Sequence, residues 1–384
     1  MAGPAHLALN LVFLVPGAMG GMERYVRQLV PGLAAACPEM RITAFVHPSA
    51  RRQIAESEIG EAARVVTHPL LGAGSRAAGE LLALGPLVRR QPGIDLLHSL
   101  AMTGPLSPPC PHVVTIGDVI WVHHPASLSR LTTTLWRVLV PPIARRSNRV
   151  ITFTDAARRD IVASLRVPTD RVDVVAPGSG LPVSSEPSPE GALRERLGLG
   201  DRRIVLTVSI LRPHKNLERL VAAMTEVTAR APDAVLVMPG RPTPYEPVLR
   251  AAIERAGMAD SVKLVGFVDE RDLEGLYRAA ACFVFPSLQE GFGLPVLEAL
   301  RRGVPVACSA VPELLEVAGD AALTFDPTDP HAIAEAILAL LNDPARAQRL
   351  ARAGPAQAQR FTVEAMVEGT LHSYAAALTD GAAG

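Results

Sequence analysis

Two glutamates flank a glycine-rich turn in EGFGLPVLE, residues 290–298, which follows the apolar run 281–285. The apolar run predicts a buried strand, and Pro295 suits the first turn of a helix, where its missing N–H is not needed. The turn between them places backbone N–H groups at the positive end of a helix dipole, where they can bind phosphate. We therefore expect a phosphate-binding turn made of Gly291, Phe292, Gly293 and Leu294.

Glu290 and Glu298 indicate a second kind of partner at this turn. Carboxylates repel phosphate, but they accept hydrogen bonds from the hydroxyls of a sugar or a ribose. A phosphate-binding turn with two hydroxyl acceptors predicts a nucleotide sugar. The alternative is an ordinary helix cap in which the carboxylate only complements the helix dipole.

A second candidate is Lys215 in SILRPHKNLERL, residues 209–220, where a predicted strand meets a predicted helix. Only Lys215 and Lys263 are lysines among the 38 basic residues. A compact ammonium binds phosphate as a point charge, and a cation gains nothing from the start of a helix. We therefore expect Lys215 to bind phosphate, with Arg212 as a candidate assistant. A surface residue at a helix start is the alternative.

The first half of the chain carries two weaker candidates. In PGAMGGMER, residues 16–24, Gly20 and Gly21 open a predicted helix that runs to about residue 36, a second helix start able to bind phosphate. In TIGD, residues 115–118, Asp118 follows a predicted strand and is placed to meet an acceptor hydroxyl. Glycine-rich first turns are common in this class of fold, and loop carboxylates are often only solvated. An ordinary helix start and a solvated carboxylate therefore stay open as alternatives.

Strand-like and helix-like segments alternate along the whole chain, which predicts an α/β fold with parallel sheets between helices. The segment 180–192, rich in Pro, Ser and Gly, predicts a linker between two doubly wound, Rossmann-like domains that face a cleft. We place the domains at 1–182 and 183–361, with a final helix at 362–384. The predicted strands are 7–15, 42–47, 65–67, 94–98, 113–116, 150–153, 172–175, 204–208, 235–238, 262–265, 281–285, 304–308 and 323–325.

Composition limits the partners. The formal net charge of zero argues against a nucleic-acid-binding protein. Residues 1–185 carry 18 arginines and 12 acidic residues, an excess of six positive charges that could face an anionic acceptor or a membrane surface, or be ordinary scatter. The four cysteines lie far apart in the sequence, which does not suggest a disulfide framework. No segment reaches the about 18–20 apolar residues of a membrane span. The sequence also contains no Asp-x-Asp motif and no His/Cys spacing typical of a metal site. We expect a cytoplasmic protein without a metal cofactor, and peripheral association with the inner face of the membrane stays open.

Several segments together resemble glycosyltransferase family four, the retaining GT-B enzymes. EGFGLPVLE is similar to the two-glutamate motif of that family, GGMER to its N-domain glycine loop and LRPHKN to its phosphate-binding segment. VGFVDERDLEGLY resembles its nucleobase-side loop, and VPELLEVAGDAALTFDP resembles a later segment of the donor domain. The resemblance covers nearly the full length of the chain.

The resemblance implies a retaining, metal-independent transfer of a hexosyl unit from a nucleoside-diphosphate sugar to a hydroxyl acceptor. The acceptor would be a glycan, a lipid-linked sugar or a secondary metabolite. It implies Lys215 on the diphosphate, Glu298 on the ribose and Glu290 near the transferred sugar. The base would lie near Gly266, Phe267 and Val268, and the last segment would pack on the first domain.

The chain departs from the family pattern at three places. Ile210 stands where many relatives have an arginine, Gly117 stands where many have a histidine, and the segment 177–180 replaces Asn-Gly-Val-Asp. These departures motivate two alternatives, a non-catalytic GT-B protein that binds nucleotide sugars or glycans, and a sugar-nucleotide epimerase.

Overall fold

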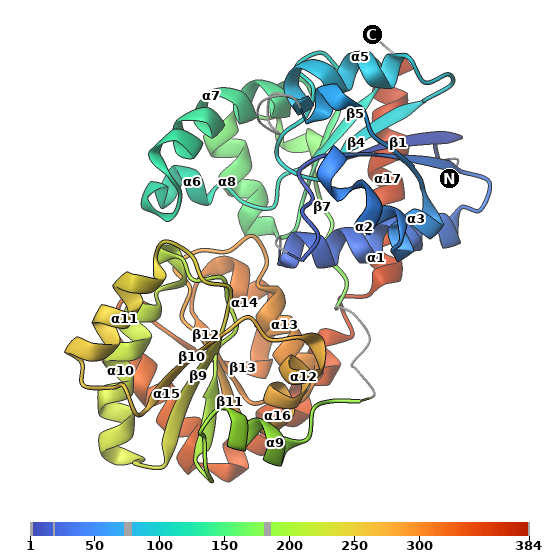
Figure 1. Ribbon diagram of the computed structural model, residues 1–384. Helices are drawn as coiled ribbons and strands as arrows, with labels where there is room; N and C mark the ends of the chain where they lie inside the picture. Colours follow the sequence, from blue (N-terminus) through green and yellow to red (C-terminus); the bar gives the residue numbers. More distant parts are fainter. Residues whose placement is uncertain (1–2, 18–19, 73–78, 180–185, 383–384) are drawn as a thin grey trace. The chain divides into compact units, whose positions relative to one another are not determined.

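The structure, a computed structural model, describes residues 3–17, 20–72, 79–179 and 186–382. The chain divides into two compact units, unit 1 formed by residues 1–180 with 361–384, and unit 2 formed by residues 181–360. In each unit a parallel sheet is flanked by helices (Figure 1). The boundary expected after residue 182 lies outside the described residues.

The sheet of unit 1 has seven parallel strands in the order β3-β2-β1-β4-β5-β6-β7. Strand β1, which lies between β2 and β4 in this sheet, is buried along its whole length. It is shorter than expected, because the chain turns after Leu11, whose carbonyl accepts the Leu14 N–H at 3.0 Å. The strands are β1 (His6–Leu11), β2 (Arg41–Val46), β3 (Arg64–Val66), β4 (Leu96–Ser99), β5 (His112–Thr115), β6 (Arg149–Thr152) and β7 (Val172–Val174).

The helices of unit 1 include the last one of the chain. Helix α17 packs against α1, β5 and β6, and Figure 1 shows it in red beside the blue N-terminal elements. The Tyr374 hydroxyl of α17 lies 2.7 Å from His98 Nδ1 on β4. The helices are α1 (Gly21–Ala36), α2 (Arg51–Ala55), α3 (Glu58–Ala62), α5 (Leu84–Arg89), α6 (Ile120–His123), α7 (Arg130–Arg146), α8 (Asp155–Leu165) and α17 (Val363–Ala382).

The sheet of unit 2 has six parallel strands in the order β10-β9-β8-β11-β12-β13. Every strand expected from the sequence is present, which confirms the α/β class. The strands are β8 (Arg203–Leu206), β9 (Ala234–Pro239), β10 (Val262–Gly266), β11 (Ala280–Phe285), β12 (Val306–Ser309) and β13 (Ala322–Phe325). The helices are α9 (Glu190–Arg196), α10 (Leu217–Arg230), α11 (Glu246–Arg255), α12 (Glu270–Ala279), α13 (Leu294–Arg301), α14 (Pro312–Ala318), α15 (Pro330–Asn342) and α16 (Pro344–Ala358).

The strand order of each sheet reverses once, between β1 and β4 in unit 1 and between β8 and β11 in unit 2. In doubly wound sheets, ligands bind beyond the carboxyl ends of the strands at this reversal. Lys215 follows β8, and Glu290 follows β11. The topology therefore brings the two main candidate segments together at the reversal point of unit 2.

Candidate active site

Lys215 and Glu290 form an ion pair at the reversal point of unit 2. Lys215 Nζ lies 2.5 Å from Glu290 Oε1, and the two side chains are 15% and 10% exposed. The ammonium also lies 5.4 Å from the centre of the Phe285 ring, at the end of β11. The sequence motifs predicted each residue separately, but they did not predict that the two side chains touch.

The Lys215 segment is tied to the chain that follows β11. Lys215 ends a short 3-10 helix, Pro213–Lys215, and its N–H donates to the Arg212 carbonyl at 3.0 Å. Asn216 adopts a left-handed conformation with φ 60°, and its side-chain amide donates to the carbonyls of Pro286 at 2.9 Å and Pro327 at 2.7 Å. These contacts fix the position from which Lys215 reaches Glu290.

Gly293 sets the start of α13, the helix expected after the glycine-rich turn. Its φ is 100°, a value that favours glycine, and a Cβ added there would lie 2.4 Å from Leu314 Cδ2. Leu294 begins the helix, and Pro295 lies in its first turn as predicted. The side chain of Phe292 is buried. Residues 290–293 form the turn that leads directly into α13.

Glu298 is held inside unit 2 by contacts from two neighbouring segments. It is 3% exposed, and its Oε2 accepts a hydrogen bond of 3.1 Å from the hydroxyl of Tyr277 on α12. Arg302 donates to the Glu298 carbonyl at 2.9 Å, lies 4.7 Å from the centre of the Tyr277 ring, and donates to Glu274 Oε2 at 2.7 Å. This carboxylate is therefore fixed in place, unlike a carboxylate that only caps a helix.

The expected base-side residues lie at the carboxyl end of β10, beside the end of β9. Gly266 has φ 71° with open space at its Cβ position, and its carbonyl accepts the Gly240 N–H at 2.8 Å. Phe267 is 63% exposed, and the Arg241 guanidinium lies 4.2 Å from the centre of its ring. Val268 follows with a half-buried side chain. Sequence reasoning missed Arg241, because the stack joins residues from two different loops.

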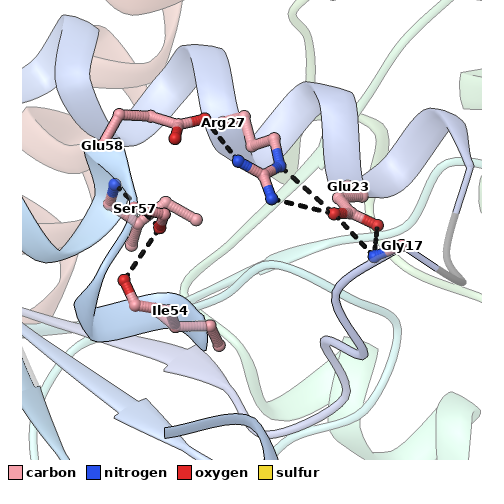
Figure 2. A network of polar contacts seen from close by, with 7 residues as sticks. Gly17, Glu23, Arg27, Ile54, Ser57 and Glu58 are labelled. Carbon is pink, nitrogen blue, oxygen red and sulfur yellow. Dashed lines mark hydrogen bonds and ion pairs between the residues drawn. The ribbon is translucent and has the colours of Figure 1, made fainter. Parts of the chain in front are cut away.

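In unit 1, the start of α1 is already close to a carboxylate. Glu23, in the first turn, accepts the Gly17 N–H with both oxygens, at 2.9 and 2.7 Å (Figure 2). Arg27 donates to Glu23 and also, at 2.7 Å, to Glu58 on α3. Gly20 has φ 56°, and α1 begins at Gly21, as predicted. Residues 18 and 19 of this motif lie outside the described residues. The Glu23 carboxylate disfavours an anion at that point. The phosphate role of Gly20 and Gly21 stays a prediction.

Asp118 lies just after β5, as predicted, and its Oδ1 accepts the Ile120 N–H at 3.0 Å. The neighbouring departure from the family pattern has a physical reason. A Cβ at Gly117 would lie 2.7 Å from Cε2 of Phe153, whose ring packs edge-on against Tyr25. The Phe153 ring therefore leaves no room here for the histidine of many relatives.

One group of side chains in the part of the chain that the structure describes could hold a metal ion. It consists of Glu226 on α10 with His331 and Glu335 on α15. Arg230 already forms ion pairs with both glutamates, so an arginine cation supplies the positive charge there. None of the three residues belongs to the candidate site described above.

Comparison with known proteins identifies the family of the chain. Residues 19–179 match the model of Glycosyltransferase Family 4, and residues 190–357 match that of Glycosyl transferases group 1. The O-antigen chain mannosyltransferase B of Escherichia coli is 34% identical over 234 residues, 59% of this chain and 60% of that protein. The D-inositol 3-phosphate glycosyltransferase of Segniliparus rotundus is 32% identical over 246 residues, 62% of this chain and 55% of that protein.

A solved structure supports the same fold. The Anabaena protein Alr3699/HepE, crystallised with UDP and glucose, superposes with a TM-score of 0.75 over 96% of this chain and 99% of that one, at 19% identity. The two doubly wound units therefore have the GT-B fold. The two family models together span most of the chain, which belongs to glycosyltransferase family four. The matched segments cover 60% and 55% of the length of the two curated relatives.

Proposed function

We propose that the chain is a glycosyltransferase that moves a hexosyl unit from a nucleoside-diphosphate sugar to a hydroxyl acceptor. The observation that carries the proposal is the ion pair of Lys215 and Glu290 beside the start of α13. Departure of the diphosphate develops negative charge on its oxygens. A fixed ammonium and a helix start are the groups that stabilise such charge in a water-poor site.

Glu290 has two tasks in this proposal. Before the donor binds, its carboxylate neutralises and orients Lys215. An ammonium has three N–H donors, so Lys215 can keep one on Glu290 and turn the others to a diphosphate. The second oxygen of Glu290 is then available to a hydroxyl of the transferred sugar, near the reacting carbon. Arg212, three residues before Lys215, would bind the diphosphate together with it.

The fixed carboxylate of Glu298 is proposed to accept hydrogen bonds from the ribose hydroxyls. Phe267 and the Arg241 guanidinium stacked on it offer a flat apolar surface and N–H donors beside Gly266 and Val268. A nucleobase would find stacking and hydrogen bonds there. The proposed contacts to base, diphosphate and ribose come from segments that follow β10, β8 and β11 of unit 2.

The transfer is proposed to retain the anomeric configuration and to need no metal ion. The sequence has no Asp-x-Asp pair, so the charge on the leaving group is assigned to Lys215 and the helix start. In the step itself, the bond from the anomeric carbon to the diphosphate oxygen breaks. The acceptor oxygen bonds to that carbon from the same face, and the departing phosphate oxygen takes the acceptor proton.

The acceptor is proposed to contact Asp118 of unit 1. A phosphate contact of Gly20 and Gly21 stays a prediction from the sequence, since the Glu23 carboxylate beside them disfavours an anion. A glycan, a lipid-linked sugar or a small hydroxyl metabolite would fit this chemistry. Two relatives are named O-antigen chain mannosyltransferase B and D-inositol 3-phosphate glycosyltransferase, and these names favour such an acceptor. A cytoplasmic location fits a nucleotide-sugar donor.

The test is transfer to methanol, a minimal hydroxyl acceptor, from a panel of nucleoside-diphosphate sugars in the presence of EDTA. A methyl glycoside cannot interconvert between anomers, so proton NMR of its anomeric coupling reports the stereochemistry. We expect the product to keep the configuration of the donor. An inverted product would refute retention, and full loss of activity with EDTA that Mg²⁺ or Mn²⁺ restores would refute metal independence.

A further inference from the structure

Helix α7 of unit 1 carries an apolar stripe on its solvent side. Leu131, Leu135 and Val138 are 71%, 42% and 64% exposed. Their spacing of four and three residues places them on one face of the helix, and Pro142 continues that face at the next turn. Figure 1 shows α7 at the periphery of unit 1, beside α6 and α8.

The opposite face of α7 explains why the stripe points outward. Thr133, Val140, Ile143 and Ala144 are buried, and the last three belong to a core cluster that includes Trp121. The helix is therefore anchored from one side by its own core. The exposed side chains are not needed for that anchoring, since the buried face lies about half a turn away from them.

The charges of α7 have one sign. The helix contains four arginines, Arg130, Arg137, Arg145 and Arg146, and no aspartate or glutamate. Within the described part of the chain, none of these four guanidinium groups has an ion-pair partner, whereas arginines elsewhere in the unit, such as Arg27 and Arg149, pair with carboxylates. A stripe of exposed apolar residues edged by uncompensated arginines matches a surface that is both apolar and anionic.

We propose that α7 is the element by which this protein docks on an anionic lipid bilayer. The helix would lie in the plane of the interface, with Leu131, Leu135 and Val138 among the acyl chains and the arginines among the lipid phosphates. A growing glycan or sugar acceptor carried by a lipid would then be presented at the surface that unit 1 touches. Docking does not depend on the proposed transfer reaction, because it is measured without donor or acceptor.

The test is flotation of the full chain with two kinds of vesicle, phosphatidylcholine alone and phosphatidylcholine mixed with phosphatidylglycerol. We expect binding to the mixed vesicles only, weakened by salt. The Leu131→Gln, Val138→Gln variant should lower the partition coefficient by tenfold or more. Burial of a single aliphatic side chain already changes a partition coefficient by about this factor. The Arg137→Gln, Arg145→Gln variant should lower it by about fivefold for each arginine removed.

A matched control lies on α16 of unit 2. Arg349 and Arg352 are exposed on this helix, and no large apolar side chain of the helix is exposed. The Arg349→Gln, Arg352→Gln variant changes the charge equally and should bind mixed vesicles as the wild type does. Equal loss in both arginine variants would overturn the proposal, as would a wild type that ignores the anionic lipid. Light scattering adds a further check, because a dimer that the stripe variant dissociates would make the stripe a protein interface instead.

Discussion

Replacing Glu290 by Gln should strengthen the binding of a free nucleoside diphosphate, although the same change lowers turnover. A phosphate oxygen in hydrogen-bond contact with Lys215 Nζ would lie within about 5 Å of Glu290 Oε1, given the 2.5 Å separation of the pair and about 2.8 Å for the new contact. At an effective dielectric constant of about 20, two negative charges at that distance repel by roughly 3 kcal/mol. Glutamine keeps the shape of the side chain and removes this repulsion.

Replacing Lys215 by Met should have the opposite effect on binding. The variant loses a charge-assisted hydrogen bond worth about 1.5–3 kcal/mol, so the dissociation constant should rise by a factor of about 10 to 150. It also leaves the Glu290 carboxylate, which is 10% exposed, without its cation. Losing one partner of a fully buried pair costs about 3–5 kcal/mol of folding free energy, and the remaining water contact lowers the expected loss here to about 1–3 kcal/mol.

The assay is calorimetric titration of both variants and of the double variant with the nucleoside diphosphate that most stabilises the wild type. Thermal unfolding of the same proteins supplies the stability cycle, in which the double variant should recover part of the loss. The two single variants should change the dissociation constant of the nucleoside diphosphate in opposite directions. If Glu290→Gln and Lys215→Met weaken nucleotide binding equally, the carboxylate is part of the nucleotide contact and its proposed role is wrong.

Three further predictions follow from the described contacts. Glu298→Gln should raise the donor KM with little change in kcat, because ribose contacts are alike in the ground and transition states, and steady-state kinetics checks this. Gly117→Ala should destabilise the fold by about 1–3 kcal/mol in chemical denaturation, because the new Cβ would lie 2.7 Å from the Phe153 ring. Burial lowers the pKa of His98 and of His112 to about 3. The folded protein therefore holds both side chains neutral at pH values where the unfolded chain, with a pKa of about 6.5, binds protons. Their contribution to the free energy of unfolding is complete above about pH 6.5 and is lost as the pH falls toward 3. Denaturation at pH 5 should find about 2 kcal/mol less stability for each histidine, and a pH-independent free energy between pH 7 and 5 would contradict the assignment.

Much of the fold could be predicted from the sequence, because buried parallel strands appear as short apolar runs between helical segments. The runs around residues 204–208 and 281–285 correspond to β8 and β11, and Pro295 marks the start of α13. The order of the strands could not be predicted, since periodicity says nothing about which strands are neighbours. The sequence predicts both segments, but only the sheet order brings Lys215 into contact with Glu290.

Other parts of the candidate site depend on packing between distant segments. Gly117 departs from the family pattern because the ring of Phe153, which follows the next strand, fills the space. Tyr277 lies in a segment singled out for its likeness to a nucleobase-side loop, but its hydroxyl donates to Glu298. Arg241 carried no signal of its own, because its stacking partner Phe267 lies in another loop. Such contacts require coordinates, whereas turn chemistry and apolar periodicity are local.

Within the described residues, no helix is both long and apolar enough to cross a membrane.

The role of Lys215 in the transfer is tested by the rate at which nucleoside diphosphate is released from its sugar donor, with EDTA present, by the wild type and by Lys215→Ala. The account predicts release by the wild type and a decrease of about 10²–10³ in kcat for the variant, because the charge that Lys215 stabilises is greatest in the transition state. Release at near-normal rate by the variant would remove Lys215 from the mechanism. A wild type that binds a nucleoside diphosphate but releases none from any donor would show a binding protein instead of a glycosyltransferase.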